Sequence, residues 1–284
     1  MSATRAQEHA NRLQIEVRGG TVPVWIRGTG PPLVLLHGLS ANHTEWSAVA
    51  SHLGSHYTVY APDLLGRGSS LVDRHARFSL GEEVERVHAV INALGIRDPV
   101  VGGHSNGATL ALALASRIPC RRIVMFSPVT PWTKRPPALD MLRWRPVRTA
   151  IRPLIGICRR PLTRYILTRR VYGDRPPPIE DAVRRYADPY ANGARGRALL
   201  RILADWQPAN VADLAAPVDV PLHVVTGDRD VRIAPHLAEA WARLIGAEFT
   251  LVAGPGHGLT EERPEVCARL LEGLGPAMDL TTRI

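Results

Sequence analysis

The sequence of 284 residues lacks long apolar runs and has few cysteines. No stretch of 18 consecutive apolar residues occurs, so the sequence predicts no membrane-spanning helix. Residues 1–12 contain no apolar core segment, and we expect no signal peptide. The three cysteines (Cys120, Cys158 and Cys267) are odd in number and widely spaced, which matches no disulfide or metal-binding framework. We therefore expect reduced thiols, a cytoplasmic location, and no metal or cofactor.

Lysine is almost absent, since Lys134 is the single lysine beside 34 arginines. Residues 131–207 hold 17 of the 35 basic side chains but only 6 of the 26 acidic ones, so the net charge of +9 belongs to this segment. Three interpretations stay open: a solvated, arginine-biased surface, a membrane-peripheral surface that contacts anionic lipids, or steering of anionic substrates such as carboxylates or coenzyme A thioesters. No nucleic-acid recognition module is present, and we expect no nucleic-acid partner.

Short apolar strands alternate with helical patterns along the rest of the chain, which predicts an α/β fold. The predicted strands are 13–17, 22–26, 32–36, 57–60, 99–101, 122–126, 221–225 and 248–252. The first two flank Gly19-Gly20 and favour a hairpin, and helices are expected over 45–53 and 82–94. We predict a mostly parallel, eight-stranded sheet with helices on both faces. Ligands of such sheets bind at the carboxyl ends of the strands.

Residues 131–207 interrupt this alternation, because no strand pattern occurs in them. Arg-Pro pairs recur at 135–136, 145–146, 152–153, 160–161 and 175–176. Proline suits the first turn of a helix and interrupts a longer one. We therefore predict several short helices inserted into a core of residues 1–130 and 208–284.

The pentapeptide Gly103-His104-Ser105-Asn106-Gly107 carries the strongest chemical signal. It follows the strand at 99–101 and precedes the helical run Ala108–Ala115, so Ser105 stands at a sharp turn between strand and helix. Glycines two residues before and after the serine permit a turn in which larger side chains would collide. This arrangement is typical of a nucleophile elbow, in which the serine hydroxyl attacks a substrate carbonyl.

A serine nucleophile needs a base, and the base needs an acid that orients it. His257 follows the last predicted strand and lies between two glycines, which favours a catalytic role over a place in the core. Asp228 and Asp230 both follow the strand at 221–225. One of them would accept a hydrogen bond from the imidazole, and the other would brace the turn.

The oxyanion formed during attack needs two backbone N–H donors. We expect one from Asn106, which follows the nucleophile, and the other from Leu39, in the loop after the strand at 32–36. His37 in the same loop is expected to shape it by hydrogen bonding.

Together these motifs resemble the α/β-hydrolase superfamily over residues 13–274. The features that carry the resemblance are His37-Gly38, Asp63–Ser69, Gly103–Gly107, Gly227–Asp230 and Gly256-His257. The resemblance implies that Asp230 is the catalytic acid, with Asp228 as the fallback, and that residues 131–207 form a lid. It also implies that Asp63 and the glycines after it form a structural turn without a chemical role. Asn106 departs from the family, in which methionine, leucine or glutamine is common at this position.

Within that superfamily, the chain looks most like esterases, monoacylglycerol-lipase-like enzymes and carbon–carbon bond hydrolases. Ser105 excludes the dehalogenases and epoxide hydrolases, whose nucleophile is aspartate, and a single lysine disfavours nitrile lyases. We expect a serine hydrolase that cleaves small-molecule carboxylic esters with an apolar acyl group. Carbon–carbon bond hydrolysis, thioester hydrolysis and acyl transfer with the same triad are alternatives. A ligand-binding protein without activity and a peripheral membrane protein are the non-enzymatic ones.

Overall fold

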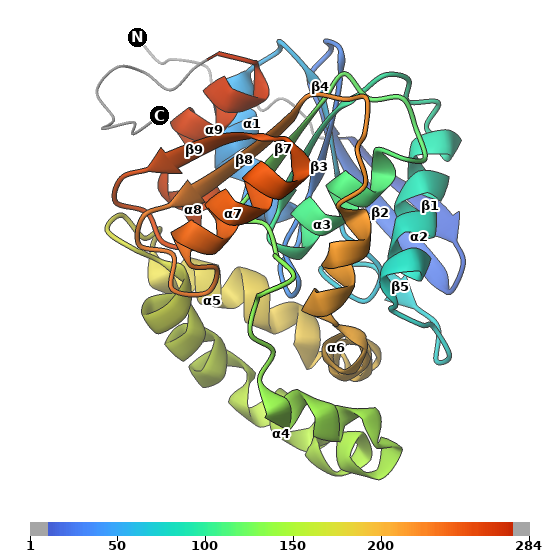
Figure 1. The fold of residues 1–284 in the computed structure, drawn as a ribbon. Helices are drawn as coiled ribbons and strands as arrows, with labels where there is room; N and C mark the ends of the chain where they lie inside the picture. The colour runs from blue at the N-terminus through green and yellow to red at the C-terminus, as the bar shows by residue number, and fades with distance from the viewer. Residues whose placement is uncertain (1–10, 275–284) are drawn as a thin grey trace, which may run out of the picture.

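A mostly parallel β-sheet organises residues 11–274, the part of the chain that the computed structural model describes (Figure 1). Eight strands lie side by side in the order β1-β2-β4-β3-β6-β7-β8-β9. Their bounds are β1 (Asn11–Val17), β2 (Gly20–Arg27), β3 (Pro32–Leu36), β4 (Thr58–Pro62), β6 (Val100–His104), β7 (Arg122–Phe126), β8 (Leu222–Gly227) and β9 (Glu248–Val252). A two-residue strand, β5 (Leu71–Val72), pairs with β2 beside this path. All neighbouring pairs from β4 to β9 are parallel, so the predicted sheet is confirmed.

The central strands are buried along their whole length because helices cover both faces of the sheet. Every residue of β6 and β8 is buried, and β3 and β7 are buried after their first residue. Such strands are continuous apolar runs rather than alternating patterns, which is how the sequence revealed them.

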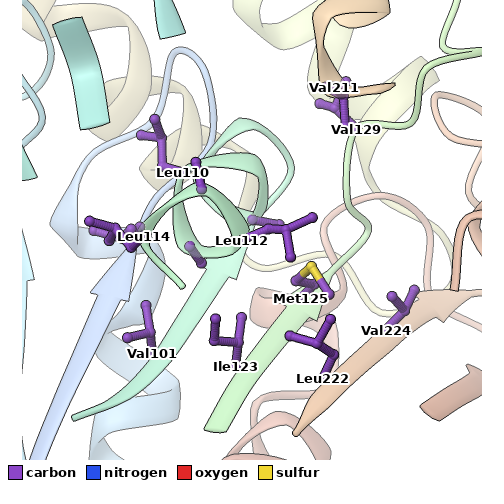
Figure 2. Close-up of a cluster of buried hydrophobic side chains, with 14 of the residues drawn as sticks. Val101, Leu110, Leu112, Leu114, Ile123, Met125, Val129, Val211, Leu222 and Val224 are labelled. Carbon is purple, nitrogen blue, oxygen red and sulfur yellow. The ribbon is translucent and has the colours of Figure 1, made fainter. Parts of the chain in front are cut away.

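One face of the sheet is covered by α2 (Leu80–Ala93), α3 (Asn106–Leu114) and α7 (Pro235–Ile245). The other face is covered by η1 (His43–Trp46), α1 (Ser47–Leu53), α8 (Leu259–Glu262) and α9 (Pro264–Leu271). Figure 2 shows leucines of α3 packed above Val101, Ile123 and Met125 of the central strands. All nine residues of α3 are buried, so the helix behind the elbow is fixed by the core.

Residues 127–221, which we call the helical segment, connect β7 to β8 and contain no strand in the described structure. Its elements are η2 (Pro137–Arg143), α4 (Arg145–Ile166), η3 (Leu167–Val171), α5 (Ile179–Ala187), η4 (Asp188–Ala191), α6 (Gly193–Asp205) and η5 (Pro208–Leu214). In Figure 1, α4 lies beyond α5 and α6, on the side away from the sheet. The role of this segment as a lid, and the domain boundaries, stay predictions.

The expectation of several short helices is wrong for residues 145–166, which form the single 22-residue helix α4 with Pro153 and Pro161 inside it. Both prolines are exposed, so water can bond the carbonyl groups that each proline leaves without an amide partner. Contacts with α5, α6 and η4 hold the rest of the helix in place.

No side chain of α4 is buried, although several are apolar. Leu154, Ile157, Leu162 and Tyr165 are all more than half exposed. Among residues 11–274, no helix combines the length and the apolar character that a bilayer crossing requires.

Candidate active site

Ser105 occupies a strained turn between β6 and α3. Its φ is 52° and its ψ is −115°, a backbone conformation that residues other than glycine rarely adopt. Its N–H donates to the carbonyl oxygen of Phe126, 2.9 Å away at the end of β7. A Cβ atom added to Gly103 would overlap the backbone of Gly107, and one added to Gly107 would overlap the carbonyl of Leu36. Both glycines are therefore required by the close approach of backbones at the elbow.

The structure brings Ser105, His257 and Asp230 together from three loops. Nε2 of His257 lies 3.1 Å from Oγ of Ser105, and Nδ1 of His257 lies 2.8 Å from Oδ2 of Asp230. The backbone N–H groups of Arg232 and Ile233 donate to Oδ1 of Asp230 at 2.8 and 2.9 Å. The carboxylate of Asp230 is thus fixed by its own loop and offers its second oxygen to the imidazole.

Burial controls the protonation of this pair. It lowers the pKa of His257, although the Asp230 carboxylate acts in the opposite direction. Burial would raise the pKa of Asp230, but the charge and hydrogen bond of His257 outweigh it, and the pKa is lowered. At neutral pH the pair is therefore a neutral imidazole beside an ionised carboxylate. In this state Nδ1 donates to Asp230, and Nε2 is free to accept the proton of Ser105.

Asp228, the other candidate acid, has a structural contact instead. Its Oδ1 accepts a hydrogen bond of 2.8 Å from the N–H of Gly254, which links the loops after β8 and β9. Of the two carboxylates, the structure places only Asp230 against His257. The catalytic roles themselves stay predictions.

The loop after β3 lies beside the nucleophile, since a Cβ atom added to Gly38 would stand 3.7 Å from Cβ of Ser105. The N–H groups of Leu39 and Asn106 donate no hydrogen bond to other residues in the range 11–274. Both predicted oxyanion donors are therefore uncommitted within that range. Asn106 begins α3, so the positive end of the helix dipole also lies at this place.

Two buried charged side chains hold the loop from opposite sides. Oε2 of Glu45 accepts the N–H of Gly38 at 2.9 Å, and Nε of Arg67 donates to the carbonyl of Leu39 at 2.9 Å. Arg67 is fully buried and forms an ion pair with Glu83. The peptide units on both sides of the one that presents the N–H of Leu39 are therefore held by hydrogen bonds.

His104 joins this loop to His257, the candidate base. Its Nδ1 contacts the carboxylate of Glu45, and its Nε2 lies 2.8 Å from the carbonyl oxygen of His257. The carbonyl oxygen only accepts, so Nε2 donates to it, and the ion-pair contact of Nδ1 with the Glu45 carboxylate favours the imidazolium form of His104. Burial would lower the pKa of His104, but the charge of Glu45 outweighs it and raises the pKa. A buried ion pair thus connects the oxyanion loop with the base.

Sequence reasoning missed Glu45, Arg67 and His104 as positioning residues. His104 stands at a variable position of the elbow motif, and Glu45 lies 59 residues before it with no spacing that relates the two. Arg67 belongs to the turn Asp63–Ser69, for which the sequence predicts only a structural role. The signal that could have found Arg67 is its place between two glycines in that turn.

The two remaining residues of interest are structural. His37 accepts the N–H of Leu64 at Nε2 (3.0 Å) and contacts the carbonyl of Gly38 at Nδ1 (2.8 Å), and burial lowers its pKa to about 4. It is therefore a neutral brace of the loop, as expected. Burial would raise the pKa of Asp63, but hydrogen bonds and charge from His43 outweigh it and lower the pKa to about 2.

A small cavity of about 60 Å³ adjoins the oxyanion donors. Half of its lining is apolar: Leu39, Phe78, Leu80, Val129, Ile202, Trp206 and Val211. The other half is polar: Ser79, Glu83, Asn106, Thr109, Asp205, Gln207 and Asn210. The side chain of Asn106 lies 3.4 Å from Glu83 on this wall. A group that enters this cavity would therefore meet an apolar surface and a hydrogen-bonding surface.

Comparison with known proteins identifies the family. The sequence model described as the alpha/beta hydrolase family matches residues 33–270, from β3 to α9. The chain belongs to the alpha/beta hydrolase family. The match includes the elbow, both acid candidates and His257, so the site of this alpha/beta hydrolase lies within it.

The relatives of this alpha/beta hydrolase carry several names. An uncharacterized protein of Mycobacterium tuberculosis is 28% identical over 271 residues, which cover 90% of the chain and 77% of the relative. A haloalkane dehalogenase of Mesorhizobium japonicum is 26% identical over 301 residues, which cover 96% of the chain and 93% of the relative. Shorter matches, to a lipase of Moraxella and a 2-hydroxymuconate semialdehyde hydrolase of Pseudomonas putida, cover 32% and 36% of the chain. These names support a hydrolase.

Among solved structures, an alpha/beta hydrolase fold protein from Burkholderia ambifaria superposes with a TM-score of 0.80. It is 24% identical, and the alignment covers 93% of this chain and 99% of that one. This likeness shows the fold.

Proposed function

We propose that this alpha/beta hydrolase is a serine hydrolase that cleaves carboxylic esters through an acyl-enzyme. The hydrogen-bonded series from Ser105 through His257 to Asp230, with uncommitted N–H groups beside the serine, carries this proposal. A hydroxyl activated in this way attacks carbonyl carbon, which is the chemistry of acyl transfer.

In the proposed reaction, Oγ of Ser105 attacks the ester carbonyl while Nε2 of His257 takes its proton. The N–H groups of Leu39 and Asn106 stabilise the oxyanion, and Asp230 stabilises the imidazolium that forms. His257 then passes the proton to the leaving alcohol, which departs and leaves an acyl-enzyme on Ser105. Water, deprotonated by His257, releases the acid and restores the serine.

The cavity beside Asn106 supports a short acyl group. Its volume of about 60 Å³ holds only a few heavy atoms, and Leu39, Val129 and Val211 supply apolar contacts for them. We therefore propose small esters with a short apolar acyl group as the first substrates to test.

The decisive experiment is labelling with a fluorophosphonate, which reacts with activated serines, followed by hydrolysis of nitrophenyl esters. Ser105→Ala should abolish labelling and lower kcat by about 10⁴-fold or more, because removal of the nucleophile leaves only the oxyanion hole and binding. Ser116→Ala, just beyond the other end of α3, is the matched control and should label as the unaltered protein does. Ester cleavage at the original rate by the Ser105→Ala variant would refute the proposal.

A substrate panel separates the alternatives that share this triad. Nitrophenyl esters, acyl thioesters and vinylogous diketones report ester, thioester and carbon–carbon bond cleavage, and an added alcohol reveals acyl transfer. A protein that only binds ligands would give neither labelling nor turnover.

A further inference from the structure

A groove lined by six arginines lies between the core and the helical segment. Its volume is about 390 Å³, and its walls come from the loop after β5, the first half of α4 and α6. The lining consists of Arg74, His75, Arg145, Arg148, Thr149, Arg152, Arg197, Leu200 and Arg201. No carboxylate is among these residues, although the described chain contains many exposed ones.

The arginines of the groove are not neutralised by ion pairs. Arg145, Arg152 and Arg197 form no salt bridge with any residue between 11 and 274, unlike Arg160 and Arg164 farther along α4, which pair with Asp188 and Glu180. Arg201 donates to the carbonyl of Arg74 at 2.7 Å, and Arg148 donates to the carbonyls of Leu142 and Arg143, so backbone contacts hold them at the groove. Six like charges around one hollow repel one another, and a bound anion would relieve that repulsion.

Shared lining residues place the groove near the cavity beside Asn106. Arg148 and Arg201 also line a neighbouring hollow of about 530 Å³, whose other walls include Arg77, Glu82 and Arg143. That hollow shares Ser79, Asp205 and Gln207 with the cavity beside Asn106. A path of shared lining residues thus runs from the oxyanion donors to the arginine groove, and positive charge increases along it.

We propose that the arginine groove binds the phosphate groups of an elongated substrate whose scissile carbonyl lies at Ser105. Guanidinium groups suit phosphate oxygens because they donate two parallel hydrogen bonds in a fixed plane. A volume of about 390 Å³ lies within the range of small-molecule sites, so a diphosphate with part of its carrier fits. This inference rests on the proposed function for the position of the carbonyl, but the groove can be tested without catalysis.

The first experiment measures binding of inorganic pyrophosphate and of coenzyme A to the Ser105→Ala variant by calorimetry. In that background, R145Q/R152Q should weaken both about tenfold, because it removes two exposed charges that pair with phosphate and not with the protein. R97Q/R121Q is the control, since both arginines are exposed and precede β6 and β7 at the opposite ends of the strands. It makes the same change in net charge and should alter the affinities less than twofold.

Two arms identify the source of the phosphate. Coenzyme A presents it on a soluble thiol carrier, and dispersed short-chain phosphatidylglycerol presents it as a lipid headgroup. Competition of either with pyrophosphate supports the groove, and the stronger competitor names the source. Absence of pyrophosphate binding, equal weakening by the control variant, or vesicle binding that soluble phosphates do not compete with would overturn the proposal.

The second experiment uses the active protein and compares a coenzyme A thioester with a neutral thioester of the same acyl group. R145Q/R152Q should raise KM for the coenzyme A thioester about tenfold and leave its kcat unchanged. For the neutral thioester, neither KM nor kcat should change. If neither thioester and no ester is turned over, the proposed catalytic function has failed, while the pyrophosphate measurement still decides the groove.

Discussion

At the residue scale, the carboxylate of Glu45 connects parts of the site that are distant in the sequence. One oxygen holds the N–H of Gly38, and the other faces the imidazolium of His104, which in turn donates to the backbone of His257. The oxyanion loop and the base are therefore positioned by one buried ion pair. Breaking such a pair leaves an uncompensated charge in the interior.

Glu45→Gln should lower kcat on a nitrophenyl ester about 100-fold and change KM little. The amide removes the counter-charge of His104 and misplaces the oxyanion donors, which act mainly in the transition state. Steady-state kinetics give both constants, and circular dichroism checks folding. Glu85→Gln, on the exposed side of α2, is the control. A variant with full kcat would show that the pair has no part in positioning.

The protonation of His257 should determine how kcat/KM depends on pH. The reaction needs the neutral imidazole, and burial lowers the pKa of His257 below its ordinary value near 6.5. Lowering the pH protonates the base, so kcat/KM should fall on the acid side with a midpoint below pH 6.5. Asp230→Asn removes the charge that raises this pKa, so the midpoint should move to still lower pH while kcat drops steeply. A midpoint above 6.5 in the unaltered protein would contradict this account.

How much of the site the sequence predicts depends on the range of the interactions. Ser105, His257 and the pair of acid candidates follow from local turns at strand ends, because strand, turn and glycine patterns involve neighbouring residues. The contacts that separate Asp230 from Asp228 join loops more than 20 residues apart, and no local pattern contains them. The contacts of Glu45 and Arg67 are hidden for the same reason, because the backbone groups and side chains that they bind lie far away in the sequence.

At the element scale, the strands lie where the apolar patterns predict them, whereas α4 continues through two prolines that predict helix breaks. Propensity predicted a break at Pro153 and Pro161, and packing of α4 against α5 and α6 outweighs it. The exposed position of both prolines limits the cost, because the carbonyls of the preceding turn are open to water. Local propensity fails here because the tertiary contacts of a long helix stabilise it by more than the loss of two hydrogen bonds costs.

Pro161→Ala should therefore stabilise α4. The substitution restores an amide donor and removes a ring clash worth about 3 kcal/mol, offset in part by the greater freedom of the unfolded chain. Hydrogen exchange of amides between residues 157 and 166 should slow about tenfold. Pro146→Ala, in the first turn of α4 where proline fits, should not slow it. Unchanged or faster exchange in the Pro161→Ala variant would mean that α4 does not continue through this proline.

At the scale of the whole molecule, stability is uneven. The sheet and the helices on its faces contain the large buried clusters, whereas α4 has no buried side chain. Elements with few buried contacts open first, because their local unfolding exposes little apolar surface.

Within residues 11–274, trypsin should first cut the chain in or beside α4. The expected sites follow Arg143, Arg148, Arg159, Arg164 and Arg169, since the bonds between arginine and proline in this helix resist the enzyme. Brief digestion and mass spectrometry would locate the first cut. A first cut after Arg117 or Arg121, which are exposed beside β7, would contradict this order of opening.

The route of the chain around β7 has a consequence for how such a protein can diversify. The helical segment departs after β7 and returns at β8, and these two strands are hydrogen-bonded neighbours. The sheet is therefore continuous across the point where the helical segment leaves and returns. Ser105, Asp230 and His257 all lie outside this segment. Exchange of residues 127–221 for the corresponding stretch of a relative should therefore change substrate choice, as long as the new stretch keeps the backbone bond that Val171 accepts from Gly258 beside His257.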